Sequence, residues 1–191
     1  MRKIKNFKIN IRPREISRIL RKLLNVPDLS IDIEESVQRA CFFYGKCIKP
    51  AVVYETFSKE SMICSFDIDT PNKWIAVSPY VLTIGNSLQE EFDNKQDIVG
   101  EYTTQIVAAI SADTLEQSKN FVQKLITSEA SNENCELSRH VDLPNNLYQD
   151  ICKVLPIEKI NVILSEDGKF EPAYSTAGLF YWIPLKKRSK K

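Results

Sequence analysis

The chain has 191 residues, of which 26 are basic and 25 acidic, so its formal net charge is only +1. This length suits one domain with a real core, and a composition of 43% hydrophobic and 27% charged residues is typical of globular rather than disordered proteins. The balanced charge argues against a nucleic-acid partner, because phosphate binding requires a surplus of Lys and Arg on one face. Basic residues still gather in one early helix and at the end of the chain, which favours a solvated face or, as the alternative, a docking patch for an acidic protein: Arg14, Arg18, Arg21, Lys22 and residues 186–191.

The cysteines and the N-terminus indicate an intracellular protein. Five cysteines are an odd number and form no CxxC pair, which argues against a disulfide framework and a thiolate zinc site. We expect Cys64 and Cys152, which lie among apolar residues, to be unpaired and structural. Residues 1–8 are charged and lack the apolar stretch of a secretory signal, and no segment reaches the roughly 20 apolar residues of a membrane span. We therefore predict a cytoplasmic protein with no membrane partner.

The first part of the chain predicts one strand and two helices. Residues 4–11 alternate imperfectly between apolar and polar, which is typical of a half-buried strand. Pro13 then opens a segment in which apolar residues recur at three-and-four spacing as far as Leu24, which predicts an amphipathic helix. Ser30 is a suitable N-cap for a second helix that ends near Ile48, before a proline.

Shorter elements are expected in the middle of the chain. Residues 52–57 and 62–68 predict a pair of strands joined by the polar turn 58–61, and residues 80–84 a further strand that ends at Gly85. The spacing then changes to that of helices, first from residue 86 or 87 through Phe92, then over residues 98–110 and 115–126.

The last third of the chain mixes a loop, a helix and strands. Residues 127–146 are polar without a period, so they are the longest predicted loop, and residues 147–155 predict a helix. Strands are expected over residues 160–164 and 177–183. Strands at both ends with helices grouped between them predict an α+β fold with a mostly antiparallel sheet.

The common catalytic motifs are absent. The sequence contains no GxGxxG, GxxxxGK[ST] or GxSxG motif, and a metal cluster is not expected because His140 is the only histidine. We interpret His140 as a solvated loop side chain. A small-molecule enzyme that uses Cys135 or His140 is a weaker alternative, because the nearby Glu133 and Glu136 disfavour a thiolate.

Three segments of the chain carry motifs that are typical of one known protein family. In residues 164–184, Pro172, Ser175, Gly178 and the pair Phe180-Tyr181 are in register with the end of that family's pattern. The helix that begins Ala112-Asp113-Thr-Leu115 is similar to the family's Ala-Asp-x-Leu helix, and Thr83-Ile84-Gly85 before two helices is a weaker third likeness. These segments resemble the activation domain of cobalamin-dependent methionine synthase. The resemblance covers roughly residues 80–184 and implies the family's fold, here as a free-standing single domain over residues 1–185 with a basic flexible tail at 186–191.

The resemblance also implies a function. Such domains bind S-adenosylmethionine and present its methyl group to a cobalamin that has left the catalytic cycle, while a flavodoxin-like donor supplies an electron. The domain itself supplies positioning, since the chemistry belongs to the cofactor. The partner implied is a corrinoid-binding methyltransferase or its cobalamin domain, and no catalytic or metal-binding residue is expected in this chain.

The resemblance implies a ligand site but also shows departures from it. The family's ligand loop reads Arg-Pro-x-Pro-Gly-Tyr; residues 138–144 retain only Arg139, suited to a carboxylate, and Pro144. Gln117 stands where the family carries Glu, beside the sulfonium. We expect residues 172–181 to line the main cleft, with Tyr174 or Tyr181 facing it. The implied ligand-binding set is Arg139, Pro144, Gln117, Tyr174, Ser175, Gly178 and Tyr181.

These departures predict that S-adenosylmethionine binds weakly or not at all. Loss of two buried polar contacts at ~1–3 kcal/mol each weakens binding by roughly 30-fold to 10⁴-fold. The leading hypothesis is an accessory protein that assists reductive methylation of a corrinoid on a separate methyltransferase. The alternative is a non-catalytic binding or assembly module that has lost the S-adenosylmethionine site.

Overall fold

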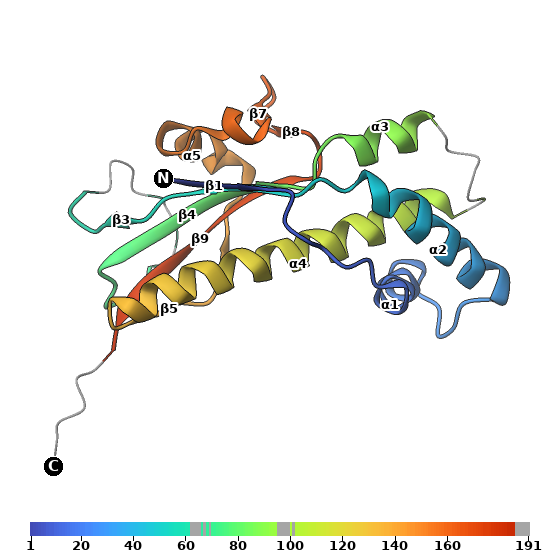
Figure 1. The fold of residues 1–191 in the computed structure, drawn as a ribbon, viewed down its shortest axis with the longest axis horizontal. Helices are drawn as coiled ribbons and strands as arrows, with labels where there is room; N and C mark the ends of the chain where they lie inside the picture. Colours follow the sequence, from blue (N-terminus) through green and yellow to red (C-terminus); the bar gives the residue numbers. More distant parts are fainter. Residues whose placement is uncertain (62–65, 67, 69, 95–99, 101, 186–191) are drawn as a thin grey trace, which may run out of the picture.

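The computed structural model describes residues 1–61, 66, 68, 70–94, 100 and 102–185, and it has the predicted α+β architecture (Figure 1). An antiparallel sheet forms the middle layer, the long helix α4 runs along one of its faces, and α5 lies on the other (Figure 1). Helices α1, α2 and α3 gather at one end of the sheet, around the first half of α4 (Figure 1). No helix of the described residues is both long and apolar enough to cross a membrane.

The sheet is centred on two long strands, β4 (Ala76–Thr83) and β9 (Ser175–Pro184), which pair from Ala76↔Trp182 to Thr83↔Ser175. The path through the sheet is β1-β2-β4-β9-β5, and every pairing is antiparallel. The shorter strands are β1 (Arg2–Lys5), β2 (Ala51–Tyr54), β3 (Phe57–Ser58), β5 (Cys135–Leu137) and β6 (Val141–Asp142). Strand β3 pairs with β4, and β6 pairs with β9.

Five α-helices and three short 3₁₀ turns complete the described chain, together with a small hairpin. The helices are α1 (Pro13–Leu24), α2 (Ile31–Tyr44), α3 (Ser87–Asn94), α4 (Thr103–Asn132) and α5 (Tyr148–Val154). The 3₁₀ turns are η1 (Gly45–Cys47), η3 (Asn145–Leu147) and η4 (Ile157–Ile160), and the hairpin joins β7 (Ile163–Leu164) to β8 (Phe170–Glu171).

Local signals explain where the first two helices begin and end. Helix α1 begins at Pro13, whose fixed φ suits the first helical position, and ends at Asn25, whose φ of 55° is left-handed. The Ser30 hydroxyl accepts a hydrogen bond from the Ile33 amide at the start of α2. Both helix starts were predicted, and the structure confirms them.

Several predicted boundaries are wrong because a left-handed residue or a 3₁₀ turn ends the element earlier. The strand expected over residues 4–11 ends at Lys5, since Asn6 has a φ of 55°. Helix α2 gives way to η1 before Ile48. At Asn161, with a φ of 58°, η4 ends, so the strand predicted over 160–164 keeps only its last two residues. Most of the strand expected at 62–68 and the first residues of the helix expected at 98 lie outside the described residues.

Helix α4 is continuous where two helices and a loop were expected. Thr114 and Ser118 bond through their hydroxyls to the carbonyls of Ile110 and Thr114, at 2.7 and 2.8 Å, so these buried polar residues stay inside the helix. The predicted loop 127–146 is also wrong, because α4 continues to Asn132 and β5 and β6 follow.

Three apolar clusters hold the layers together. The cluster on the α5 side joins the sheet to α5, η4 and β8, and the cluster on the α4 side joins the opposite sheet face to the second half of α4. The third cluster packs α1, α2 and α3 against the first half of α4. Cys152 is a free thiol, as expected, and so are Cys41 and Cys135, whereas Cys64 lies outside the described residues.

Candidate functional site

The segment from Ser138 to Leu143 runs along β9 and carries the candidate site. The Ser138 amide donates to the Tyr181 carbonyl at 2.8 Å, and the Leu143 amide donates to the Ala177 carbonyl at 3.0 Å. Between them β6 pairs with β9, and Asp142 lies opposite Gly178. The segment is therefore an edge of the sheet, and its backbone fixes where Arg139 and His140 lie.

Gly178 is needed because two side chains fill the space that its own side chain would occupy. A Cβ at this position would lie 2.6 Å from both His140 Nε2 and the Tyr80 hydroxyl. Tyr80 is directly opposite Gly178 in the β4–β9 register, and its hydroxyl shares a hydrogen bond with His140 Nε2. The absence of a side chain at Gly178 thus lets two side chains from other segments come close to the β9 backbone.

His140 is half-buried, so its interpretation as a solvated side chain is wrong. Its ring lies 5.3 Å from that of Phe180 and 5.7 Å from that of Tyr80. Its Nδ1 lies 3.7 Å from a carboxylate oxygen of Asp142, and Lys119 of α4 donates to the other oxygen at 2.6 Å. A buried phenol is thus linked through an imidazole to an exposed carboxylate and a lysine.

Burial sets the protonation states in this cluster. Burial lowers the pKa of His140, opposed by the nearby Asp142 carboxylate, so the imidazole is neutral at neutral pH. Burial also raises the pKa of Tyr80 far above its ordinary value, which keeps the phenol protonated. The arrangement can orient a hydrogen bond between Tyr80 and His140, but it offers no activated nucleophile.

Arg139 and Tyr181 meet in a small hollow on the other side of the segment. The hollow has a volume of about 280 Å³ and is also lined by Thr70, Pro71, Ser138 and Val141. Tyr181 is 1% exposed and lies at a ring distance of 5.2 Å from Trp74, and burial raises its pKa. The Arg139 guanidinium is exposed at the rim, where it could bind a carboxylate through a bidentate pair.

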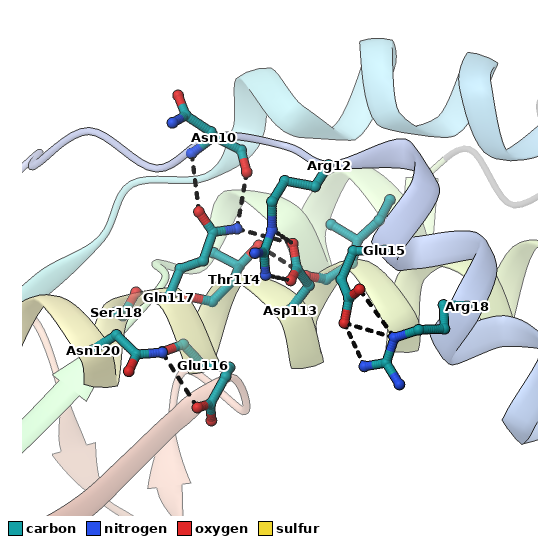
Figure 2. A network of polar contacts seen from close by, with 11 residues as sticks. Asn10, Arg12, Glu15, Arg18, Asp113, Thr114, Glu116, Gln117, Ser118 and Asn120 are labelled. Carbon is teal, nitrogen blue, oxygen red and sulfur yellow. Dashed lines mark hydrogen bonds and ion pairs between the residues drawn. The ribbon is translucent and has the colours of Figure 1, made fainter.

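The remaining predicted residues lie elsewhere. Pro144 is exposed at the start of η3, and Tyr174 packs against the cluster of α1, α2 and α3. Ser175 pairs with Thr83, and its buried hydroxyl has no hydrogen-bond partner among the described residues. Gln117 is on α4, where its amide is bonded to Asn10 and Asp113 (Figure 2).

Residues 172–181 therefore contribute to two hollows and not to one cleft. Tyr181 lines the hollow with Arg139, whereas Pro172 lines a separate pocket of about 420 Å³ beside Gly85 and Lys49. Sequence reasoning missed Tyr80, Asp142 and Lys119, because only the β4–β9–β6 register brings them to Gly178. Among the described residues, no group of three or more His, Cys, Asp or Glu side chains could hold a metal ion.

The architecture defines a class of fold that is represented among solved structures. Neither a family model nor a curated protein matches the sequence. A solved structure described as the MetH reactivation domain bound to AdoHcy matches 98% of this chain and 80% of its own, with a TM-score of 0.57. The two sequences are only 12% identical, so the likeness establishes the fold alone.

Proposed function

We propose that this chain is an accessory protein of a cobalamin-dependent methyltransferase, which docks on the corrinoid-binding module and assists the return of its cofactor to the methylated state. The observation that carries the proposal is the likeness to the reactivation domain over 98% of the chain. The motifs around Asp113 and Gly178 resemble the same family. The corrinoid would be carried by another domain or protein, and a flavodoxin-like protein is the proposed electron donor.

The side chains fit an S-adenosyl ligand only in part. Arg139 is exposed beside the Tyr181 hollow and suits the carboxylate of the amino acid portion. The space beside Gly178 is filled by Tyr80 and His140, so a ligand cannot approach the backbone there. The Gln117 amide is already bonded to Asn10 and Asp113.

For these reasons we propose that S-adenosylmethionine binds weakly or not at all to the isolated chain, while docking to the corrinoid protein persists. Docking uses a wide surface and is less sensitive to a few lost polar contacts. The same crowding at Gly178 favours a second candidate function, an assembly module that has kept the fold and lost the nucleotide ligand.

The test combines calorimetry with spectroscopy. The purified chain is titrated with S-adenosylmethionine and with AdoHcy, and separately mixed with a cobalamin-binding methyltransferase module while the visible spectrum of the corrinoid is recorded. We expect a spectral shift and no ligand affinity in the micromolar range. Absence of binding to any corrinoid module contradicts the accessory role, and micromolar affinity contradicts the weakened site.

A matched pair of variants tests Arg139. Arg139→Ala should abolish any residual affinity for AdoHcy, whereas Arg14→Ala makes the same charge change on exposed α1 and should leave it unaltered. If both variants bind equally, the carboxylate is held elsewhere.

A further inference from the structure

A groove lies between the N-terminal segment and helix α4, away from Arg139 and His140. It has a volume of about 390 Å³ and is lined by Lys8, Ile9, Arg12, Gln117, Asn120, Phe121 and Lys124. This volume is within the range of small-molecule sites, about 300–1,000 Å³. Gln117 is one of its lining residues, so the groove meets α4 at the position where the resemblance implies a ligand contact.

The wall formed by residues 7–12 is held in place by polar bonds to α4 (Figure 2). The Gln117 amide donates to the Asn10 carbonyl at 2.8 Å, and its oxygen accepts from the Asn10 amide at 3.3 Å. Arg12 pairs with Asp113, which is 2% exposed. At the other end Phe7 stacks on Phe121, with ring centroids 4.2 Å apart. The groove is therefore preorganised.

The charge that lines this groove is positive. Lys8, Arg12 and Lys124 line it, and no Asp or Glu is among its described lining residues. The Asp113 carboxylate is bonded to Arg12 through Nε at 3.3 Å and also accepts from Gln117. Asp113 therefore compensates the charge of Arg12, and the local excess of cations consists of Lys8 and Lys124, in a chain whose net charge is only +1.

We propose that the groove between residues 8–12 and α4 binds a phosphate-bearing small molecule of mononucleotide size, with its phosphate between Lys8 and Lys124 and its flat apolar body against Ile9 and Phe121. Lysine ammonium groups bind phosphate as point charges. The Asn120 amide at the rim is bonded to the Glu116 carbonyl at 2.9 Å, so the lysines supply the charge. The same lysines would repel the cationic sulfonium of S-adenosylmethionine. The groove therefore favours an anionic ligand and not S-adenosylmethionine, the ligand that the family resemblance implies at Gln117. The inference is independent of the proposed function.

The test measures binding of AMP, adenosine and pyrophosphate by NMR chemical-shift changes in the full chain. We expect saturable shifts for Gln117, Phe121 and Lys124 with AMP, smaller shifts with pyrophosphate and none with adenosine. Binding of AMP should weaken as NaCl is raised, because the interaction is between charges near the surface. Shifts of equal size with adenosine, or none with either AMP or pyrophosphate at millimolar concentration, would overturn the proposal.

Two double variants that lose the same charge distinguish binding in the groove from a general effect of the protein's net charge. Lys8→Gln with Lys124→Gln should weaken AMP binding at least tenfold. Lys3→Gln with Lys73→Gln removes the same charge from two exposed positions outside the groove and should change affinity less than twofold. Equal losses in both variants would show that no local site exists.

Discussion

The two faces of the sheet are packed in different ways although both are buried. The face toward α5 is mainly aliphatic and closes against apolar side chains of α5, η4 and β8. The face toward α4 carries aromatic side chains whose polar atoms are hydrogen-bonded: Tyr54 donates to Glu129 at 2.8 Å, the Trp182 indole donates to Ser78 at 2.8 Å, and Tyr80 bonds to His140. A buried hydroxyl or indole N–H stabilises the fold only when it is hydrogen-bonded. The side chains packed on the α4 face must therefore occupy more narrowly defined positions than those on the α5 face.

The largest effect is expected on the apolar face. Phe170 is 4% exposed and stacks on Tyr148 with ring centroids 4.0 Å apart. Phe170→Ala should lower the free energy of unfolding by about 3–5 kcal/mol, since it leaves a cavity, as measured by urea denaturation. Ile163→Ala in the adjoining hairpin, where the side chain is 55% exposed, is the control and should change it by less than about 0.5 kcal/mol. Equal effects would mean that this face is not close-packed.

A methyl group at Gly178 tests the crowding on the α4 face. Gly178→Ala should cost about 1–3 kcal/mol of stability, because the new Cβ overlaps the Tyr80 hydroxyl and His140. In a double-mutant cycle, His140→Ala should recover part of this loss, and additive effects would contradict the proposed overlap.

Two tyrosines, one on each face of the sheet, test whether a buried hydroxyl group contributes more to stability on the α4 face. Tyr54→Phe removes the hydroxyl that donates to Glu129 and should cost about 0.5–1.5 kcal/mol. Tyr181→Phe removes a hydroxyl from the other face and should cost less, measured by thermal denaturation. If Tyr181→Phe lowers stability as much as Tyr54→Phe, buried hydroxyl groups contribute to stability on both faces and not mainly on the α4 face.

The smallest effect concerns pH. The folded pKa of His140 is below its unfolded value of about 6.5, because burial disfavours the imidazolium. Between the folded pKa of His140 and its unfolded value of about 6.5, the unfolded chain binds more protons than the folded chain. The contribution of His140 to stability is therefore complete above about pH 6.5 and is lost as the pH falls from there through the folded pKa. In His140→Gln, the free energy of unfolding should depend less on pH below about 6.5 than it does in the wild type. If the two proteins show the same dependence, His140 is not the group that causes it. The charged groups around it, Asp142, Lys119 and Glu116, are retained in both proteins.

Predictions from the sequence succeed where the signal is local. Pro13 and Ser30 mark helix starts through their own backbone and hydroxyl chemistry, and the apolar run after Ala177 marks β9, so the α+β class follows. They fail where a distant segment decides the outcome. The polar stretch after Asn132 becomes an edge of the sheet because β9 offers it backbone partners.

The candidate site shows the same limit. The sequence singles out Gly178 through the family resemblance, but which side chains lie beside it depends on the register that places Tyr80 opposite. The half-burial of His140 and the contact between Arg139 and the Tyr181 hollow depend on the same pairing. Neither is encoded in the few residues around each position.

Helix α4 has a mechanical consequence. At about 1.5 Å per residue, its 30 residues form a rod of roughly 45 Å. Its first half is packed among α1, α2 and α3, and its second half lies against the sheet, so it belongs to two clusters at once. Loosening either end must therefore strain the middle turns around Thr114 and Ser118, whose amides should be among the slowest in the chain to exchange their hydrogens with solvent.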